Sequence, residues 1–491
     1  MGIDISRSEF DDDDYRRFSA RLHDNLTALK QVLSQPDFGE GELSFGAELE
    51  LYIIDKEARP LHINQAIQKK LNDPQLTLEL NRYNLEYNFS PVMLKDSCLH
   101  ATQQQALDAL EKINKCAKKW KGKVVPIGIL PTLQQADTGY HAMTKLARYE
   151  ALTRQLTQLR GGPFTIAIEG PETIQLAMED VTLEGANTSF QIHLRIPPKE
   201  FVDFYNALQL VTPLVVALAS NSPMLFGHHL WQETRVPLFK QSIDCRQKDP
   251  LHPIPARVNY GNNWIHDGAF ELFAEAVYLY RPILPVCSEE DPLDVLKHGG
   301  TPHLYELRLQ QGSVWLWNRP VFDPIDGGHL RVEMRALPAG PSVVDMLANA
   351  ALLIGLARLM QQNIKDLLPA IPFNYCIGNF YRAAEKGLDA DLIWPSTRQN
   401  EPVYLPAAVI LESLLSKIPE QLNNMGFVAA DYQPLLAVAE ERLATRQTGA
   451  QWQLKKLAEY RKEMPKREAL VAMLFDYQRN SEANRPVAQW P

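Results

Sequence analysis

The chain has few cysteines for its length, and they lie far apart. The five cysteines among its 491 residues are at positions 98, 116, 245, 287 and 376, and none forms a CxxC pair. Zinc sites and redox dithiols use closely spaced cysteines, so we expect neither here. An odd number of dispersed thiols is typical of a reducing compartment, which predicts a cytoplasmic protein.

The chain also lacks a long basic block, a secretion signal and a clear membrane span. Its net charge of −9 argues against nucleic acid as the main partner. The N-terminal sequence MGIDISRSEFDDDDY has no basic segment followed by an apolar one, so we expect no signal peptide. The most apolar segment, 207–226, contains Pro213, Asn221 and Pro223, which favours a buried core helix and no membrane partner.

Apolar residues are plentiful, at 45% of the chain, and can form a large core. Strands and helices are expected to intermingle up to about residue 340, and helices to dominate after about residue 400. This order predicts an α+β fold. We expect a mobile acidic N-terminus at 1–14, a catalytic core at 15–365, a mostly helical part at 366–480 and a tail at 481–491.

Apolar periodicity predicts the individual elements. Helices are expected at 15–34, 99–121, 142–160, 199–220, 268–280 and 341–361. Strands are expected at 44–54, 76–80, 84–90, 123–131, 164–168, 188–196, 312–317 and 330–336. We expect the helix at 341–361 to begin at Pro341, because proline is favoured in a first turn.

The sequence SFGAELELYIID, residues 44–55, places two carboxylates on one face of a strand. Side chains alternate along a strand, so Glu48, Glu50 and Tyr52 point away from the apolar face. Two adjacent anions repel and are costly to desolvate, and a divalent cation such as Mg²⁺ would remove that cost. Taken alone, the pair fits the solvated face of an edge strand at least as well.

Two further segments carry polar side chains in a similar pattern. LELNRYNLEYNFSPV contains Glu79 and Glu86, which could be surface residues or ligands beside the first pair. TSFQIHLRI places Gln191, His193 and Arg195 on one strand face. An amide, an imidazole and a guanidinium in line suit a site for a metal and an anion, but also fit an exposed face of a sheet.

The fourth pattern is GSVWLWNRPVF followed by LRVEMRALPAGP. Arg331, Glu333 and Arg335 alternate with apolar residues, and Arg319 lies upstream. An ion-pair ladder on a surface is one interpretation of this alternation. If the face lines a cleft, Glu333 can bind a metal while arginines neutralise phosphate oxygens.

The motifs GAELELY, LEYNFSP, FQIH, NRP and RVEMR, taken in this order, resemble the glutamine synthetase and glutamate–cysteine ligase superfamily. The resemblance spans about residues 44–361 and is to the carboxylate–amine ligases of the second glutamate–cysteine ligase group. It implies a glutamine synthetase-like curved antiparallel β-sheet with flanking helices and a helical C-terminal region. The inner face of such a sheet holds ATP with Mg²⁺ or Mn²⁺.

The resemblance also implies roles for individual residues. The metal ligands implied are Glu48, Glu50, Glu79, Glu86, Gln191 and Glu333. The contacts to ATP implied are His193, Arg319 and Arg335, with Arg319 and Arg335 as the catalytic pair. Arg246 is placed to bind the α-carboxylate of the substrate. Many relatives have His where this chain has Gln191, so whether Gln191, His193 or neither contacts metal stays open.

The implied activity is that of an ATP-dependent carboxylate–amine ligase. It would join glutamate, or a similar carboxylate, to an amine such as cysteine through an acyl phosphate, and glutamate–cysteine ligase itself is one candidate. Mobile loops at 131–140 and 244–266 are expected to exclude water. The alternatives are a guanidino-kinase-like phosphotransferase and a non-catalytic nucleotide-binding homologue. The C-terminal helices could support a homo-oligomer.

Overall fold

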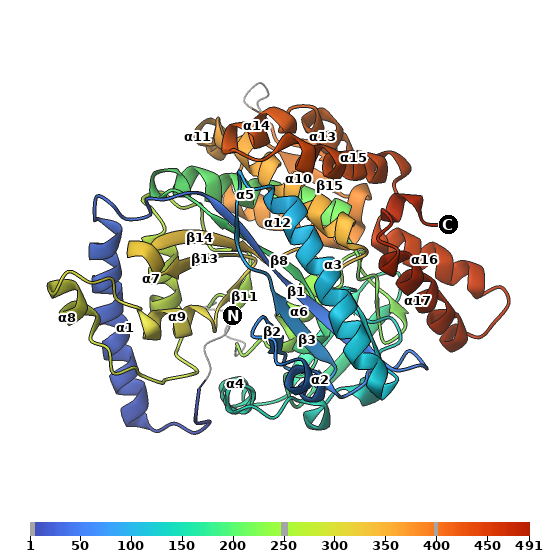
Figure 1. Ribbon diagram of the computed structural model, residues 1–491, viewed down its shortest axis with the longest axis horizontal. Helices are drawn as coiled ribbons and strands as arrows, with labels where there is room; N and C mark the ends of the chain where they lie inside the picture. The colour runs from blue at the N-terminus through green and yellow to red at the C-terminus, as the bar shows by residue number, and fades with distance from the viewer. Residues whose placement is uncertain (1–4, 247–253, 397–400) are drawn as a thin grey trace.

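In the computed structural model of the protein, residues 5–246, 254–396 and 401–491 are described (Figure 1). The largest sheet in these ranges has eight strands, six of them in the order β13-β14-β8-β1-β3-β2, while β4 and β5 pair with β1. Every pairing in this sheet is antiparallel, as predicted. The strands are β1 (Ser44–Ile54), β2 (Leu76–Leu78), β3 (Asn84–Asn88), β4 (Val92–Met93), β5 (Lys123–Val125), β8 (Phe190–Arg195), β13 (Asn318–Asp323) and β14 (His329–Met334).

One face of this sheet packs on the main hydrophobic core. Leu49, Leu51 and Ile53 of β1 are buried there. The helix α3 (Cys98–Ala117) packs against β1, and α10 (Val343–Gln361) packs along α5 (Phe201–Ala219). Because side chains alternate along β1, the carboxylates of Glu48 and Glu50 lie on the opposite face.

The apolarity of α5 and α10 is explained by their place in the core. Among the described residues, Pro198–Ala219 and Val343–Gln361 are the two helical stretches long and apolar enough to cross a membrane by length and composition. In the most apolar 18-residue part of each, 89% and 83% is buried inside the protein, as in core helices. The prediction of a buried core helix in this part of the chain is confirmed.

Shorter elements surround the sheet. The helices of the first 311 residues, besides α3 and α5, are α1 (Asp12–Leu33), α2 (Asn64–Leu71), α4 (Ala147–Arg160), α6 (Arg235–Ser242), α7 (Phe270–Tyr278), α8 (Pro292–Lys297) and α9 (Tyr305–Gln311). The two-stranded sheets are β6 (Phe164–Glu169) with β7 (Thr173–Met178), β9 (Met224–Leu225) with β10 (His228–His229), β11 (Val258–Asn259) with β12 (Trp315–Leu316), and β15 (Asp391–Trp394) with β16 (Val403–Pro406).

Several boundaries differ from the predictions. Helix α1 begins at Asp12, within the segment expected to be mobile, because Asp11 caps it and Asp14 completes a capping box. Helix α10 begins at Val343, not at Pro341, because the Ser342 side chain caps it.

Two strand predictions also need correction, and two strands were missed. The strand expected at 123–131 ends at residue 125, and the one expected at 312–317 is only Trp315–Leu316. Strands β7 and β13 were not predicted. Strand β13 contains Pro320, which is tolerated because β13 is an edge strand of the sheet.

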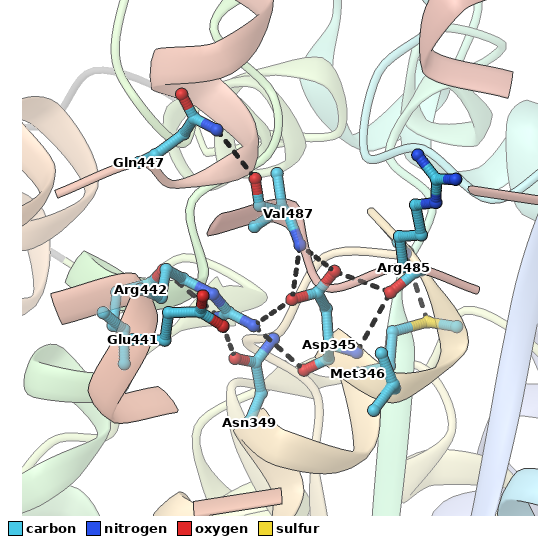
Figure 2. A network of polar contacts seen from close by, with 12 residues as sticks. Asp345, Met346, Asn349, Glu441, Arg442, Gln447, Arg485 and Val487 are labelled. Carbon is cyan, nitrogen blue, oxygen red and sulfur yellow. Dashed lines mark hydrogen bonds and ion pairs between the residues drawn. The ribbon is translucent and has the colours of Figure 1, made fainter. Parts of the chain in front are cut away.

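The C-terminal region is helical, as predicted, and its last residues are packed against it. Its helices are α11 (Ile364–Leu367), α12 (Phe373–Lys386), α13 (Ala407–Leu415), α14 (Ile418–Met425), α15 (Ala429–Thr445), α16 (Gly449–Tyr460) and α17 (Lys466–Glu482). Figure 2 shows Arg442 and the Val487 N–H converging on the Asp345 carboxylate. Val487 and Trp490 are buried, so the segment predicted as a polar tail is docked.

Candidate active site

The polar face of the large sheet gathers most of the predicted site residues. Directly opposed residues in antiparallel strands share a face. The opposed pairs are Glu48–Gln191, Glu50–Glu86 and Glu333–His193. Four strands that are distant in sequence, β1, β3, β8 and β14, therefore present their polar side chains side by side.

The first group on this face consists of Glu48, His193 and Glu333. Each offers one ligand atom, and these atoms all lie within 4.8 Å of one another. His193 Nε2 is 3.1 Å from Glu48 Oε1. Burial opposes ionisation of Glu48, whereas the contact with His193 and the charge of Arg335 lower its pKa. Glu48 is therefore anionic at neutral pH.

Two arginines hold Glu333 in place. Arg319 donates from Nε to Oε2 at 2.5 Å and from Nη2 to Oε1 at 2.9 Å, and Arg335 Nη1 donates to Oε1 at 2.7 Å. Burial opposes ionisation of Glu333, but Arg319 and Arg335 lower its pKa far enough to keep it anionic. The predicted catalytic arginines thus lie at the first group.

Gln191 links the first group to the second. Its carbonyl oxygen accepts a short hydrogen bond from Arg335, and its Nε2 donates to Glu50 Oε1 at 2.8 Å. The structure places His193 among the clustered ligand atoms, and it places Gln191 between Arg335 and Glu50. The metal role of Gln191 stays a prediction, and its observed contacts fit a linking residue.

The second group consists of Glu50, Glu79 and Glu86, whose ligand atoms also lie within 4.8 Å of one another. Burial, and then the charge of Glu86, raises the pKa of Glu50 to about 8. Burial, Glu86 and Glu50 raise the pKa of Glu79 well above its ordinary value, and burial with Glu48 raises that of Glu86. These carboxylates cannot all ionise together without a cation.

Hydrogen bonds fix the orientation of the second group. Glu50 Oε2 accepts from the Ser189 N–H at 2.7 Å. Glu86 Oε1 accepts from Thr77 Oγ1 at 3.0 Å and from Asn88 Nδ2 at 2.8 Å. Such contacts hold carboxylates in defined positions, as the partners of metal ligands do in proteins.

Both groups fit divalent cations by the chemistry of their donors. Carboxylate oxygens suit hard cations such as Mg²⁺ and Mn²⁺, and an imidazole beside two carboxylates also suits Mn²⁺. In the described part of the chain, these are the two groups of three or more such side chains that could hold a metal. Glu48 and Glu50, two residues apart on β1, belong to different groups.

Sequence reasoning missed one carboxylate and one arginine near these groups. Glu184 precedes β8, and burial raises its pKa to about 7 against the charges of Arg335 and Arg148. Its charge in turn raises the pKa of Glu50, whereas the buried Arg235 lowers it. Both residues lie outside the strand alternation that reveals the others, so no local pattern could have identified them.

Arg246 lies in another environment. Its guanidinium donates to both oxygens of Asp244 in the same loop, at 2.8 and 2.7 Å. Residues 247–253 are outside the described residues, so the loop predicted at 244–266 is only partly defined. The other predicted loop, 131–140, contains the short helix Gln135–Asp137 and the start of Tyr140–Ala142. Substrate binding by Arg246 stays a prediction.

Arg195 and Arg331 lie on the same strands as His193 and Glu333. They oppose each other two residues along from the pair of His193 and Glu333. Arg195 donates to the carbonyl oxygens of Gly39 and Glu40, and Arg331 pairs with Asp323 at 3.2 Å. Arg195 is therefore bonded to the loop before β1, and Arg331 to the edge strand β13.

Comparisons with known proteins give a family match and a match of fold. The model of glutamate-cysteine ligase family 2 (GCS2) matches residues 44–422. The comparison with curated proteins gives no match.

Two solved structures are similar to this chain. A glutamate–cysteine ligase from Francisella tularensis, solved with AMP, is 11% identical and has a TM-score of 0.51, over 91% of this chain and 90% of that one. A bifunctional glutathione synthetase from Pasteurella multocida is 10% identical with a TM-score of 0.47, over 94% of this chain and 55% of that one. The predicted α+β fold of the glutamine synthetase-like class is confirmed.

Proposed function

The chain belongs to glutamate-cysteine ligase family 2, and on this premise we propose that it is an ATP-dependent ligase forming a γ-glutamyl amide. The observation that carries the proposal is one sheet face with two groups of acidic ligands, joined through Arg335 and Gln191. ATP and a dicarboxylate bring several negative charges together, so a site that can hold two cations and two arginines suits them. The dispersed cysteines support a cytoplasmic location.

Each group has a separate task in this proposal. Glu48, His193 and Glu333 would hold one cation, and the group around Glu50 would hold another. When bound, Mg²⁺ or Mn²⁺ would neutralise phosphate oxygens and polarise the transferring phosphoryl group. Arg335 contacts Glu333 and Gln191, and a guanidinium has more N–H donors than these two bonds use. Its other donors can stabilise charge on the γ-phosphate.

The proposed reaction has two steps. An oxygen of the substrate carboxylate attacks the γ-phosphorus of ATP, and the bond from that phosphorus to the bridging oxygen breaks to release ADP. The amine nitrogen then attacks the acyl carbon, the acyl carbon–oxygen bond breaks, and phosphate leaves while the amine loses a proton. The carboxylates and arginines, which are fixed by their hydrogen bonds, contribute by orienting the reactants and by compensating charge. These are the main factors in phosphoryl transfer.

The test is a mass-spectrometric screen of amines with glutamate, ATP and Mg²⁺ or Mn²⁺. We expect a γ-glutamyl amide, ADP and phosphate with at least one amine. Glu48→Gln and Glu86→Gln, one change in each group, should each lower kcat at least about 100-fold, because each neutralises an anionic ligand. Glu42→Gln, which changes a carboxylate 55% exposed and paired with Lys95, serves as the control and should keep activity.

Other outcomes would identify another function. A phosphorylated acceptor without amide would indicate the phosphotransferase, and absence of both nucleotide binding and turnover would indicate a non-catalytic homologue. Full activity in both Glu48→Gln and Glu86→Gln would show that this sheet face is not the active site.

A further inference from the structure

The segment 336–340, which follows Arg335 without regular secondary structure, is bonded to the start of β8. The Phe190 N–H donates to Leu337 O at 3.1 Å, and the Ala339 N–H donates to Thr188 O at 3.2 Å. These two bonds lie on either side of Ser189 in the sequence. The position of the segment therefore sets the position of the Ser189 backbone.

Ser189 connects this segment to the second carboxylate group. Its N–H donates to Glu50 Oε2 at 2.7 Å, and its backbone forms a β-bridge with Pro338. Arg335 immediately precedes the segment in the chain. The position of these five residues therefore also affects the position of the Arg335 backbone and, through it, of the guanidinium. A shift of the segment would move both Glu50 and Arg335.

Two buried polar side chains hold the segment from the other side. Asn221 Nδ2 donates to Ala339 O at 2.8 Å and to the Tyr477 hydroxyl at 2.8 Å, and this hydroxyl donates to Pro126 O at 2.9 Å. Asn221 and Tyr477 are both 0% exposed. A Cβ atom at Gly340 would lie under 3.0 Å from Pro126 O and from the Tyr477 hydroxyl, so the packing leaves no space.

The C-terminal helices supply one of these two side chains and fix the other. Tyr477 is on α17, and Gln453 of α16 donates from Nε2 to Asn221 O at 3.1 Å and to Asn221 Oδ1 at 2.9 Å. The ring of Trp490 packs edge-on against Tyr477, with centroids 5.1 Å apart. The Asp345 network of Figure 2 fixes the chain just before Trp490.

We infer that Asn221 and Tyr477 are positioning residues through which the C-terminal helices set the placement of Glu50 and Arg335. The path runs from Tyr477 and Asn221 to Ala339, from there to Thr188, and through Ser189 to Glu50. The C-terminal helices thus form part of the support of the active site. The effect on metal binding rests on the proposed function, whereas the coupling between the two regions does not.

The test compares two buried tyrosine hydroxyls that have the same chemistry. Tyr477→Phe removes the hydroxyl that joins Asn221 to Pro126. Tyr432→Phe is the matched control, since that hydroxyl is also buried and donates to a proline carbonyl, Pro419 O, at 3.1 Å within the C-terminal helices. Gln453→Met, which removes the bonds from α16 to Asn221, is a second variant on the same path.

The first measurement is amide hydrogen exchange of the metal-free protein. We expect Tyr477→Phe and Gln453→Met to speed exchange in peptides covering 186–195 and 330–341, while Tyr432→Phe leaves these peptides unchanged. The second measurement is Mn²⁺ affinity by calorimetry. There we expect about a threefold or greater loss for Tyr477→Phe and no change for Tyr432→Phe, since supporting contacts tune metal sites.

Failure of this inference can be told apart from failure of the proposed function. If the unchanged protein binds no Mn²⁺, the metal role is wrong, but the exchange data still test the coupling. If exchange in the two peptides is the same in Tyr477→Phe as in the unchanged protein, or rises equally in Tyr432→Phe, the positioning role is overturned.

Discussion

At the scale of single residues, Glu48 and Glu50 show how neighbours decide the chemistry of identical side chains. Both are on the same face of β1, yet the pKa of Glu48 is lowered and that of Glu50 is raised to about 8. Burial opposes ionisation in both. Glu48 lies beside His193 and near Arg335, whereas Glu50 faces Glu86 across the strand pair. The carboxylates of the first group therefore ionise readily, whereas ionisation of the second group is opposed by burial and by its like charges.

The first prediction at this scale concerns protons released by metal binding. A metal ligand must be deprotonated, and at pH 7 the metal-free protein keeps protons on Glu50, whose pKa is raised to about 8. Mn²⁺ binding at pH 7 should therefore release about one proton or more, and its affinity should rise with pH until about pH 8. Calorimetry in MOPS and in Tris, which differ in heat of ionisation, measures this release.

The sign of the accompanying stability change follows from the same shift. The folded-state pKa of Glu50 lies above its ordinary value of 4.5, so the metal-free folded protein holds more protons than the unfolded chain between these values. Its stability should then fall as pH rises through this window.

Glu50→Gln is the control for the measurement of proton release. Mn²⁺ binding to this variant should release about one proton fewer than binding to the unchanged protein. Equal heats of binding in both buffers would contradict the prediction.

At the scale of elements, the irregular segment after β14 matters as much as the strand itself. Segment 336–340 fills the space between the start of β8 and the C-terminal helices, and its backbone is bonded on both sides. Gly340 has a φ of +79°, and the atoms around it leave no space for a side chain. Backbone conformation and close packing both require glycine there.

We therefore predict a large loss of stability for Gly340→Ala. The new methyl group would clash with Pro126 O and the Tyr477 hydroxyl, and we expect a cost of at least about 3 kcal/mol in the free energy of unfolding. Gly426→Ala is the matched control, because Gly426 has a φ of +93° and a methyl group there would meet no neighbouring atom within 4 Å. Its cost should be only about 1–2 kcal/mol, from the backbone alone.

Urea unfolding of both variants measures the difference. Equal costs for Gly340→Ala and Gly426→Ala would mean that the packing at Gly340 relaxes around a methyl group. In that case the segment after β14 would be less constrained than its contacts indicate.

At the scale of the whole molecule, the C-terminal region is locked onto the core by a buried ion pair. Arg442 Nη2 donates to Asp345 Oδ1 at 2.6 Å, and the two side chains are 1% and 0% exposed. Asp345 also accepts from Ser342 and from the Val487 N–H. One carboxylate thus joins the start of α10, helix α15 and the last residues of the chain.

Removing one partner of this pair should be costly. Asp345→Ala leaves the guanidinium of Arg442 buried without its anionic partner, and we expect a loss of about 3–5 kcal/mol in the free energy of unfolding. Asp389→Ala is the control, since Asp389 pairs with Arg446 at the same 2.6 Å but is 71% exposed, and should cost under about 1 kcal/mol. Similar midpoints of chemical unfolding for the two variants would contradict this account.

The sequence by itself determined which strands carry the clustered polar side chains and which side chains share a face. Alternation along residues 44–55 and 188–196 is a local property, because each side chain follows from its own position in the strand. The order of five short motifs indicated the family, and the family match confirms it. Apolar periodicity identified the core helices α5 and α10 for the same local reason.

Only the tertiary structure decided how these side chains combine. Cross-strand register places Glu86 opposite Glu50 and His193 opposite Glu333, so that Glu48 and Glu50 belong to different groups. The place of Glu184 and the docking of the C-terminal residues depend on contacts between segments far apart in the chain. Local patterns cannot encode such contacts, because they are set by which strands pair and by which helices cover them.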